Sequence, residues 1–301
     1  MIFLRLATVF LIILAFAAVF VLPKTSPDFS APKIEKKSIK THALPQDKLY
    51  RKNSQNLLDP PVISAKSVII IDAANGIVLY EKDPDVRSLP ASTTKLMTAL
   101  VAKQNCYPEE IVTVNYIENQ PTQMGLEMGD TIRVDSLLYG LLVASGNDAA
   151  YALARGCAAS LDQFVGDMNQ TARKLGMADS HFVNPAGFDD PAQFTTAHDL
   201  AKLAKIAVTD PLLSKIVATK SIVLTDVTGV KTYYLENVNK LLGNVNGVEG
   251  VKTGKTEGSL ESLIAKTTRE EHSIVTVVLG STDRFEDSKQ LIEWVFKNYR
   301  W

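Results

Sequence analysis

The sequence is poor in histidine and in the motifs that hold metals, phosphates or cofactors. The four histidines, His42, His181, His198 and His272, form no pair at a metal-binding spacing. No glycine-rich phosphate loop and no zinc-type cysteine cluster is present. The 32 lysines and arginines nearly balance the 33 acidic residues, so nothing in the charge favours nucleic acid as a partner. We therefore expect no metal and no cofactor.

Residues 1–22 differ from the rest of the chain. Residues 6–22 form an apolar run whose single polar member is Thr8, and Arg5 precedes it. A helix of about 20 apolar residues spans a bilayer, so this segment predicts an N-terminal membrane anchor. A cleaved signal peptide is the alternative, because Ala15-Phe16-Ala17 fits a small-x-small cleavage site. Either reading places the remaining chain in the extracytoplasmic cell envelope, and the anchor would tether it to the cytoplasmic membrane.

Residues 23–61 read as a linker. They hold six of the 13 prolines, several lysines and few apolar residues. Such a segment cannot bury enough apolar surface to offset the loss of chain entropy on folding. We therefore expect the folded, catalytic domain to occupy residues 62–301.

Three short motifs lie within this predicted domain. They are Ser92-Thr93-Thr94-Lys95, Ser145-Gly146-Asn147 and Lys252-Thr253-Gly254. Together they supply a nucleophilic hydroxyl, an amine base, a hydroxyl–amide pair and a cation beside a glycine. Second copies of the first two patterns, at 30–33 and 54–56, lie in the predicted linker and are discounted. The motifs predict a serine acyl-transfer site that works without histidine.

The first motif predicts the nucleophile and its base. Residues three apart share a face of a helix, so Lys95 should reach the Ser92 hydroxyl. Lys95 has to be neutral to act as a base, and we expect burial and the nearby charge of Lys252 to lower its pKa. The start of the helix would add a backbone N–H group for the oxyanion.

The second motif predicts a turn. Gly146 is expected to take an unusual backbone angle between Ser145 and Asn147. The Ser145 hydroxyl can then relay a proton to the departing amine, and the Asn147 amide can orient the peptide group of the substrate.

The third motif predicts a binding strand. Alternation along a strand puts Lys252 and Gly254 on one face and Thr253 on the other. A glycine allows a close approach of the strand to a substrate. If the strand twists at the site, the Thr253 hydroxyl could hold a carboxylate beside Lys252.

The two cysteines, Cys106 and Cys157, follow Ser92 and Ser145 at similar distances along the chain. Both intervening segments are predicted helices that run away from the same site, so their far ends could meet. An exported domain permits a disulfide, and two buried free thiols are the alternative. The sequence leaves both open.

Periodicity predicts strands at both ends of the domain and helices between them. Strands are expected over 67–72 and 77–80 with a turn at Asn75-Gly76, and a helix from Ser92 to about Gln104. Later helices are expected over 135–144, 147–155, 161–175, 196–208, 211–218 and 285–298, and strands over 221–224, 247–253, 259–266 and 272–279. Short connections between the late strands favour antiparallel pairing. The predicted fold is α/β: an antiparallel sheet flanked by helices, a helical lobe over about 90–220, and a site between them.

The order of these motifs and the residues around them resemble the D-alanyl-D-alanine carboxypeptidases, the low-molecular-mass penicillin-binding proteins. The resemblance runs from about Ser67 to about Phe296 and includes 90–95, 141–150, 182–190 and 247–254. It implies a β-lactamase/transpeptidase-like fold. It also implies that a peptidoglycan stem peptide ending in D-Ala-D-Ala acylates Ser92 and releases D-alanine, and that β-lactams inhibit by acylating the same serine.

The resemblance further implies a role for each site residue. Lys95 is the base, Ser145 and Asn147 complete the catalytic group, Lys252, Thr253 and Gly254 bind the terminal carboxylate, the backbone of Lys255 donates to the oxyanion, and Arg284 assists carboxylate binding.

Two departures from the family pattern stand out. Ser259-Leu260 stands where the family often has Ala-Gly after its Lys-Thr-Gly motif. The stretch after Lys252 is also too short for the second β-domain and the C-terminal amphipathic anchor that are common in the family. The apolar segment at 1–22 would take the place of that anchor.

Alternative functions remain open at this stage. A serine β-lactamase uses similar motifs, but its class A members need a glutamate to activate water, and the chain has no glutamate between Glu127 and Glu236. Asp189 and Asp190 are interpreted as acids that shape a loop. An inactive peptidoglycan-binding homologue is the second alternative. Carboxypeptidase and endopeptidase action are not separated, and neither is the preferred stem peptide.

Overall fold

The computed structural model describes residues 59–301. The predicted anchor or signal peptide (1–22) and nearly all of the predicted linker (23–61) lie outside the described residues. Within residues 59–301, no helix combines the length and the apolar character that a membrane crossing requires. The predicted domain boundary at residue 62 stays a prediction.

A five-stranded antiparallel sheet forms the centre of the fold, in the order β2-β1-β9-β8-β7. Its strands are β1 (Ser67–Asp72), β2 (Val78–Lys82), β7 (Val248–Thr256), β8 (Leu260–Arg269) and β9 (His272–Ser281). Every residue of β1 is buried, because this strand has a neighbour on each side and packing on each face. This explains why its sequence is a run of β-branched residues without polar alternation.

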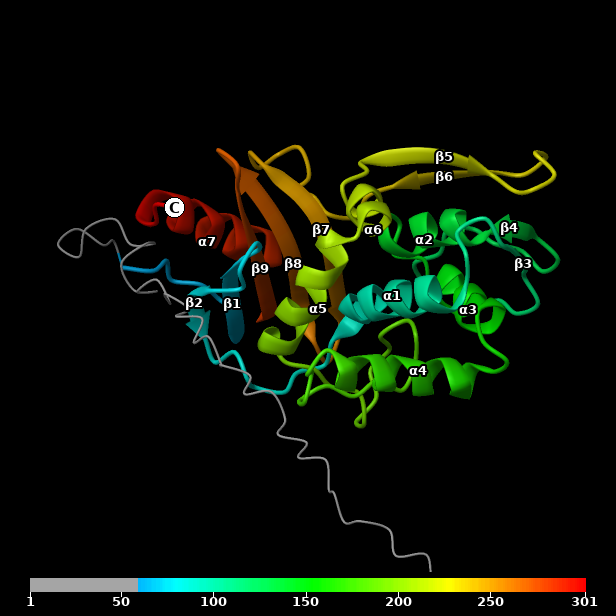
Figure 1. Ribbon diagram of the computed structural model, residues 1–301, viewed down its shortest axis with the longest axis horizontal. Coiled ribbons are helices and arrows are strands. Elements are labelled where there is room, and N and C mark those ends of the chain that lie inside the picture. Colours follow the sequence, from blue (N-terminus) through cyan, green and yellow to red (C-terminus); the bar gives the residue numbers. More distant parts are fainter. Residues whose placement is uncertain (1–58) are drawn as a thin grey trace, which may run out of the picture. The chain divides into compact units, whose positions relative to one another are not determined.

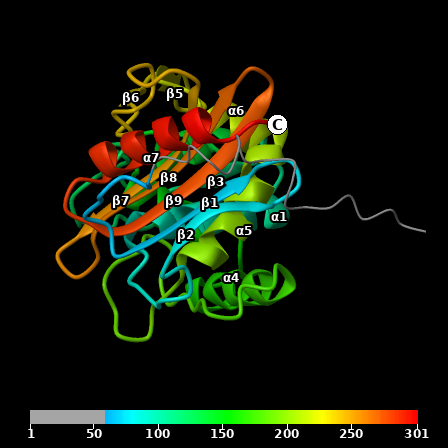
Figure 2. The same ribbon diagram turned by 90° about the vertical axis from the view of Figure 1, so that its left-hand side faces the viewer.

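Helices cover both faces of the sheet (Figures 1 and 2). On one face α7 (Arg284–Asn298) packs on β8 and β9, and Ile292 and Val295 meet Leu263 there without exposed surface. On the other face α5 (Ala197–Thr209) packs on β1 and β9. Each fully buried aliphatic side chain contributes about 1.5–3 kcal/mol relative to exposure, so these two layers fix the position of the sheet.

The helical lobe stands beside the edge of the sheet that carries β7 (Figure 1). It contains α1 (Lys95–Asn105), α2 (Val134–Leu142), α3 (Asn147–Gly156), α4 (Leu161–Lys174) and α6 (Pro211–Val217). The antiparallel sheet flanked by helices and the helical lobe confirm the predicted fold class. Cys106 and Cys157 form a disulfide with Cα atoms 5.5 Å apart, which joins the end of α1 to the end of α3. This settles the choice that the sequence left open.

The structure corrects the prediction in three places. The helix predicted from Ser92 begins with a 3-10 turn, Ala91–Thr94, before α1 starts. The strand predicted over 221–224 lies outside the main sheet, as β5 (Ser221–Thr225) paired with β6 (Thr232–Glu236). The short pair β3 (Ile111–Thr113) and β4 (Thr131–Arg133) was not predicted. Strands of three residues are too short to show a period of two.

Candidate active site

Ser92 and Lys95 meet where the 3-10 turn passes into α1. Lys95 Nζ lies 2.9 Å from Ser92 Oγ, and it donates to Asn147 Oδ1 at 2.7 Å and to the Ala186 carbonyl oxygen at 2.9 Å. The Asn147 and Ala186 oxygens can only accept, whereas the Ser92 hydroxyl can also donate. A neutral amine has two N–H groups and one lone pair. An ammonium could donate to all three oxygens, and a neutral Lys95 can donate to Asn147 and Ala186 while it accepts the proton of Ser92.

Burial makes the neutral form of Lys95 accessible. The side chain has no exposed surface. Burial lowers the pKa of Lys95 to about 7, and the Asp148 carboxylate acts in the opposite direction. A substantial fraction of Lys95 is therefore neutral near neutral pH.

Ser145 faces a second buried lysine. Lys252 Nζ donates to Ser145 Oγ at 2.8 Å and to the Thr253 carbonyl oxygen at 2.9 Å. Burial, repulsion from Lys95 and repulsion from Arg284 hold the pKa of Lys252 well below its usual value. We expected the charge of Lys252 to lower the pKa of Lys95. Burial is instead the cause of the lowered pKa of Lys95, and the repulsion between the two lysines contributes to the lowered pKa of Lys252.

The turn of the second motif differs from the prediction. Gly146 has an ordinary φ of -57°, and the positive φ, 61°, falls on Ser145. Gly146 is needed for space, because a Cβ there would lie 2.7 Å from Asp148 Oδ1 and 3.1 Å from the Met124 nitrogen. A non-glycine residue at positive φ costs about 1–2 kcal/mol, so the surrounding contacts hold the Ser145 hydroxyl in a strained position.

The third motif lies on β7, at the edge of the main sheet. A Cβ on Gly254 would lie 3.0 Å from the Ala91 Cβ and 3.1 Å from the Ser92 nitrogen. The missing side chain thus lets the strand lie against the peptide that carries the nucleophile. Lys255 follows with an exposed side chain paired to Glu261 at 2.9 Å, and Thr253 is buried.

Arg284 reaches the same strand from the first residue of α7. Its Nη1 donates to the Gly254 carbonyl oxygen at 2.8 Å, and its guanidinium lies 4.8 Å from the centre of the Phe285 ring. Burial lowers the pKa of Arg284. The sequence-predicted residues of all three motifs and Arg284 are thus brought into one neighbourhood, although they are far apart in the chain.

Sequence reasoning gave no role to the carbonyl of Ala186. Its loop is held by Asn184 Oδ1, which accepts from the nitrogens of Gly187 and Phe188 at 2.7 and 3.0 Å. Gly187 has φ +90°, and a Cβ there would lie 1.8 Å from the Ala91 carbonyl oxygen. The glycine of the Asn184–Phe188 run was the available signal, because it marks a close approach of backbone.

Asp189 connects this loop to the β7–β8 turn, where Leu260 begins β8. Asp189 accepts from Thr256 Oγ1 at 2.7 Å and from the Gly258 nitrogen at 3.0 Å, so it shapes the loop. Leu260 has a φ of 57°. The residue flagged as a departure from the family pattern therefore occupies a backbone conformation that glycine adopts without strain.

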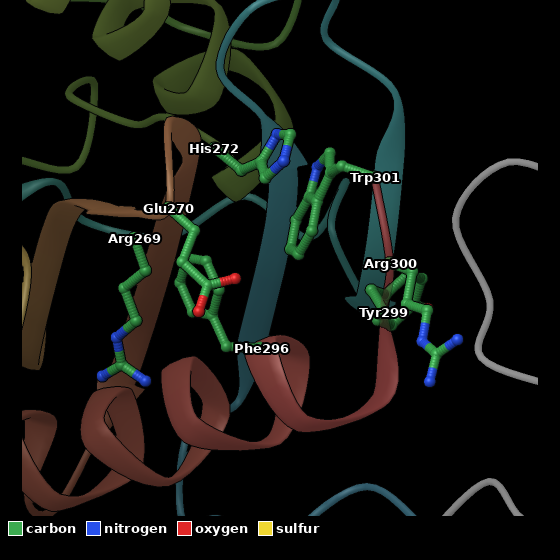
Figure 3. A pocket seen from close by; sticks show the side chains of 7 residues that line it. All are labelled: Arg269, Glu270, His272, Phe296, Tyr299, Arg300 and Trp301. Carbon is green, nitrogen blue, oxygen red and sulfur yellow. The ribbon is translucent and has the colours of Figure 1, made fainter.

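A cavity of about 520 Å³ lies at the ends of β8 and β9 that are remote from the motifs (Figure 3). It is lined by Arg269, Glu270, His272, Phe296, Tyr299, Arg300 and Trp301. The Trp301 indole stacks on His272 with ring centres 5.1 Å apart and donates to Asp72 Oδ2 at 2.9 Å. Strand β8 runs ten residues, from Leu260 near the motifs to Arg269 at this cavity. The cavity is therefore separate from the candidate active site.

Comparisons with known proteins agree with this geometry. The family model described as D-alanyl-D-alanine carboxypeptidase matches residues 54–283. The chain is 35% identical over 262 residues to D-alanyl-D-alanine carboxypeptidase DacC of Escherichia coli, covering 81% of this chain and 64% of that protein. It is 34% identical over 257 residues to the D-alanyl-D-alanine carboxypeptidase of a Streptomyces species, covering 78% of this chain and 88% of the relative.

Solved structures give the same result. The structure of a Streptomyces DD-transpeptidase superposes with a TM-score of 0.74 at 31% identity, covering 80% of this chain and all of that one. A penicillin-binding protein homologue from Mycobacterium tuberculosis superposes with a TM-score of 0.74 at 29% identity, covering 81% and 95%. The chain spans less than two thirds of the Escherichia coli relative. With three motifs gathered around one serine–lysine pair and a family match over most of its length, the chain belongs to the D-alanyl-D-alanine carboxypeptidase family.

Proposed function

We propose that the chain is a serine-type D-Ala-D-Ala carboxypeptidase. It removes the terminal D-alanine from peptidoglycan stem peptides through an acyl-enzyme on Ser92, and β-lactams acylate the same serine. The single observation that carries this proposal is the contact of Ser92 Oγ with a buried Lys95 whose other two contacts are acceptors. The names of the relatives as D-alanyl-D-alanine carboxypeptidases support the choice of substrate.

Acylation then begins with the serine–lysine pair. The Ser92 proton moves to Lys95 Nζ while Ser92 Oγ attacks the carbonyl carbon of the penultimate D-alanine. The backbone N–H groups of Ser92 and Lys255 hold the resulting oxyanion. The C–N bond breaks, and the proton passes from Lys95 through the Ser145 hydroxyl to the departing amine. Water then hydrolyses the ester and restores Ser92, with Asn147 keeping Lys95 in place.

The terminal carboxylate of the substrate binds beside Lys252, Thr253 and Gly254. An anion raises the pKa of a neighbouring amine, so carboxylate binding favours the protonated form of Lys252. Arg284, which lies against Gly254, adds a second cation to this subsite. The site therefore favours peptides with a free carboxylate end.

In this function, residues 62–301 form the catalytic domain in the bacterial cell envelope, outside the cytoplasmic membrane, with 1–22 as its anchor and 23–61 as its linker. The disulfide between Cys106 and Cys157 supports an oxidising compartment.

Incubation of the full chain with defined muropeptides, followed by mass analysis, tests the proposal. Release of a single D-alanine from D-Ala-D-Ala stems is expected. Cleavage of cross-linked dimers without D-alanine release would instead indicate endopeptidase action. Rapid turnover of benzylpenicillin would indicate a β-lactamase, whereas a long-lived acyl-enzyme agrees with the proposal. Absence of both D-alanine release and penicillin labelling would overturn it.

The rate of acylation is expected to rise with pH through about 7, because burial lowers the pKa of Lys95 to about 7 and only the neutral amine accepts the Ser92 proton. Well below that pH the rate should fall about tenfold for each pH unit, as the neutral fraction does. The second-order rate constant for benzylpenicillin, measured across the range, gives the midpoint. Thermal melts at each pH control for unfolding, and a midpoint near the ordinary lysine value would contradict the prediction.

A further inference from the structure

Asp148 is a buried carboxylate for which the proposed chemistry has no direct use. It follows Asn147 at the start of α3 and has no exposed surface. Its oxygens accept hydrogen bonds from the backbone nitrogens of Met124 (2.9 Å), Gly125 (2.9 Å) and Leu126 (3.0 Å), and from its neighbour Ala149 (2.8 Å). A buried charge of this kind is expensive unless such donors satisfy it. Its main partner is thus the loop 121–126.

The same loop accepts two hydrogen bonds from Asn147. The Asn147 nitrogen donates to the Thr122 carbonyl oxygen at 2.8 Å, and Asn147 Nδ2 donates to the Pro121 carbonyl oxygen. The first bond fixes the backbone of Asn147 and the second fixes its side-chain amide, which leaves Asn147 Oδ1 for Lys95 Nζ. The contacts therefore form one chain from Asp148 through the loop and Asn147 to Lys95.

The fit between the loop and this turn is tight. Gly146 has no room for a Cβ between Asp148 Oδ1 and the Met124 nitrogen, and Gly140 has none beside Met124 Sδ, which would lie 2.2 Å away. Thr122 has a φ of 71°, a strained angle that the surrounding contacts have to maintain. A shift of the loop would therefore move Asn147.

We propose that Asp148 is a positioning residue for Lys95: its carboxylate fastens the loop 121–126, and the loop holds the Asn147 amide against the lysine. The inference rests on the proposed function, in which Lys95 is the base. It gives the Ser145-Gly146-Asn147 motif a fourth member that does not touch the substrate.

The negative charge of Asp148 also acts on Lys95 directly. It raises the pKa of Lys95, although burial lowers that pKa by more. The other charged side chain that faces Lys95 is Lys252 on β7, and Arg284 at the start of α7 acts on Lys252. Loss of the Asp148 charge would therefore move the titration of Lys95 to lower pH, while loss of packing alone would not.

The test is Asp148→Asn in the full chain, with benzylpenicillin acylation measured against pH and normalised to the folded fraction. We expect acylation to be about 10- to 100-fold slower, as for the loss of a charged hydrogen-bond network. The acid limb of the profile, which is the fall in acylation rate at low pH, should be displaced to lower pH. The matched control is Asp199→Asn. Asp199 is also buried and binds a loop, through the Asp179 nitrogen and the Ser180 hydroxyl, each at 2.9 Å. That variant should lose stability and keep the wild-type pH limb.

A normalised rate and a pH limb equal to wild type in Asp148→Asn would overturn the proposal. If that variant does not fold, Met124→Ala loosens the loop without changing charge, and it should slow acylation with an unchanged limb. An unchanged rate in Met124→Ala would also count against the proposal. If wild type itself neither takes the label nor releases D-alanine, the proposed function has failed. Amide hydrogen exchange then decides separately, since strong protection at Met124, Gly125 and Leu126 is expected of wild type and rapid exchange there would refute the anchoring.

Discussion

Replacing Ser92 by alanine is expected to abolish covalent labelling by benzylpenicillin and to lower kcat/KM for D-alanine release by at least about 10⁴-fold, as the loss of a nucleophile does in other serine hydrolases. The reason is that Ser92 Oγ contacts Lys95, the lysine whose remaining bonds suit a neutral base. Intact-mass measurement after incubation with the drug gives the labelled fraction directly.

The matched variant is Ser145→Ala, because Ser145 also contacts a buried lysine, at 2.8 Å from Lys252 Nζ. Ser145 is 5% exposed, whereas Ser92 is less buried and lies within the 3-10 turn, with its nitrogen close to β7. Ser145→Ala should react slowly yet still carry the adduct on Ser92. Peptide mapping that placed the adduct on Ser145 would reverse the assignment of the two serines.

Removal of the Cys106–Cys157 disulfide, by the double variant Cys106→Ala and Cys157→Ala, is expected to lower the free energy of unfolding by about 4 kcal/mol. The bond closes a loop with a sequence separation of 51 residues, so its loss enlarges the conformational freedom of the unfolded chain. Urea denaturation of the oxidised wild type and the double variant measures the difference.

The catalytic groups should be little affected in the folded double variant, because the bond joins the ends of α1 and α3 that lie away from Lys95 and Asn147. Acylation by benzylpenicillin below the unfolding transition is therefore the control. Wild type reduced with a thiol should match the double variant in stability. An equal midpoint for oxidised and reduced protein would show that the crosslink does not stabilise the fold.

The long elements were predictable because their periodicity reflects burial. The helix over 161–175 and the last helix each carry an apolar stripe, and the structure has α4 and α7 there. The run 67–72 gave a buried strand for the same reason. The hairpin of β5 and β6 pairs only with itself, and no local pattern distinguishes such a pair from a strand of the main sheet.

The candidate site was predictable where its chemistry is carried by side chains. The spacing of Ser92 and Lys95 and the glycine of the third motif are visible in the residues themselves. Three features depend on contacts between distant segments: the Ala186 carbonyl, the positive φ of Ser145 and the hold of Asp148 on its loop. A backbone oxygen has no identity in a sequence, so only the folded chain reveals that it binds Lys95.

Two glycines pack closely against Ala91, the residue that precedes the nucleophile Ser92. Ala91 has a φ of 48°, with Gly187 against its carbonyl oxygen and Gly254 against its methyl group. A side chain on Gly187 would collide with the Ala91 carbonyl oxygen, and one on Gly254 would force the Ala91 methyl group to shift. If β-lactams acylate Ser92 as proposed, a substitution at either glycine that slowed this reaction would also displace the nucleophile from the natural substrate.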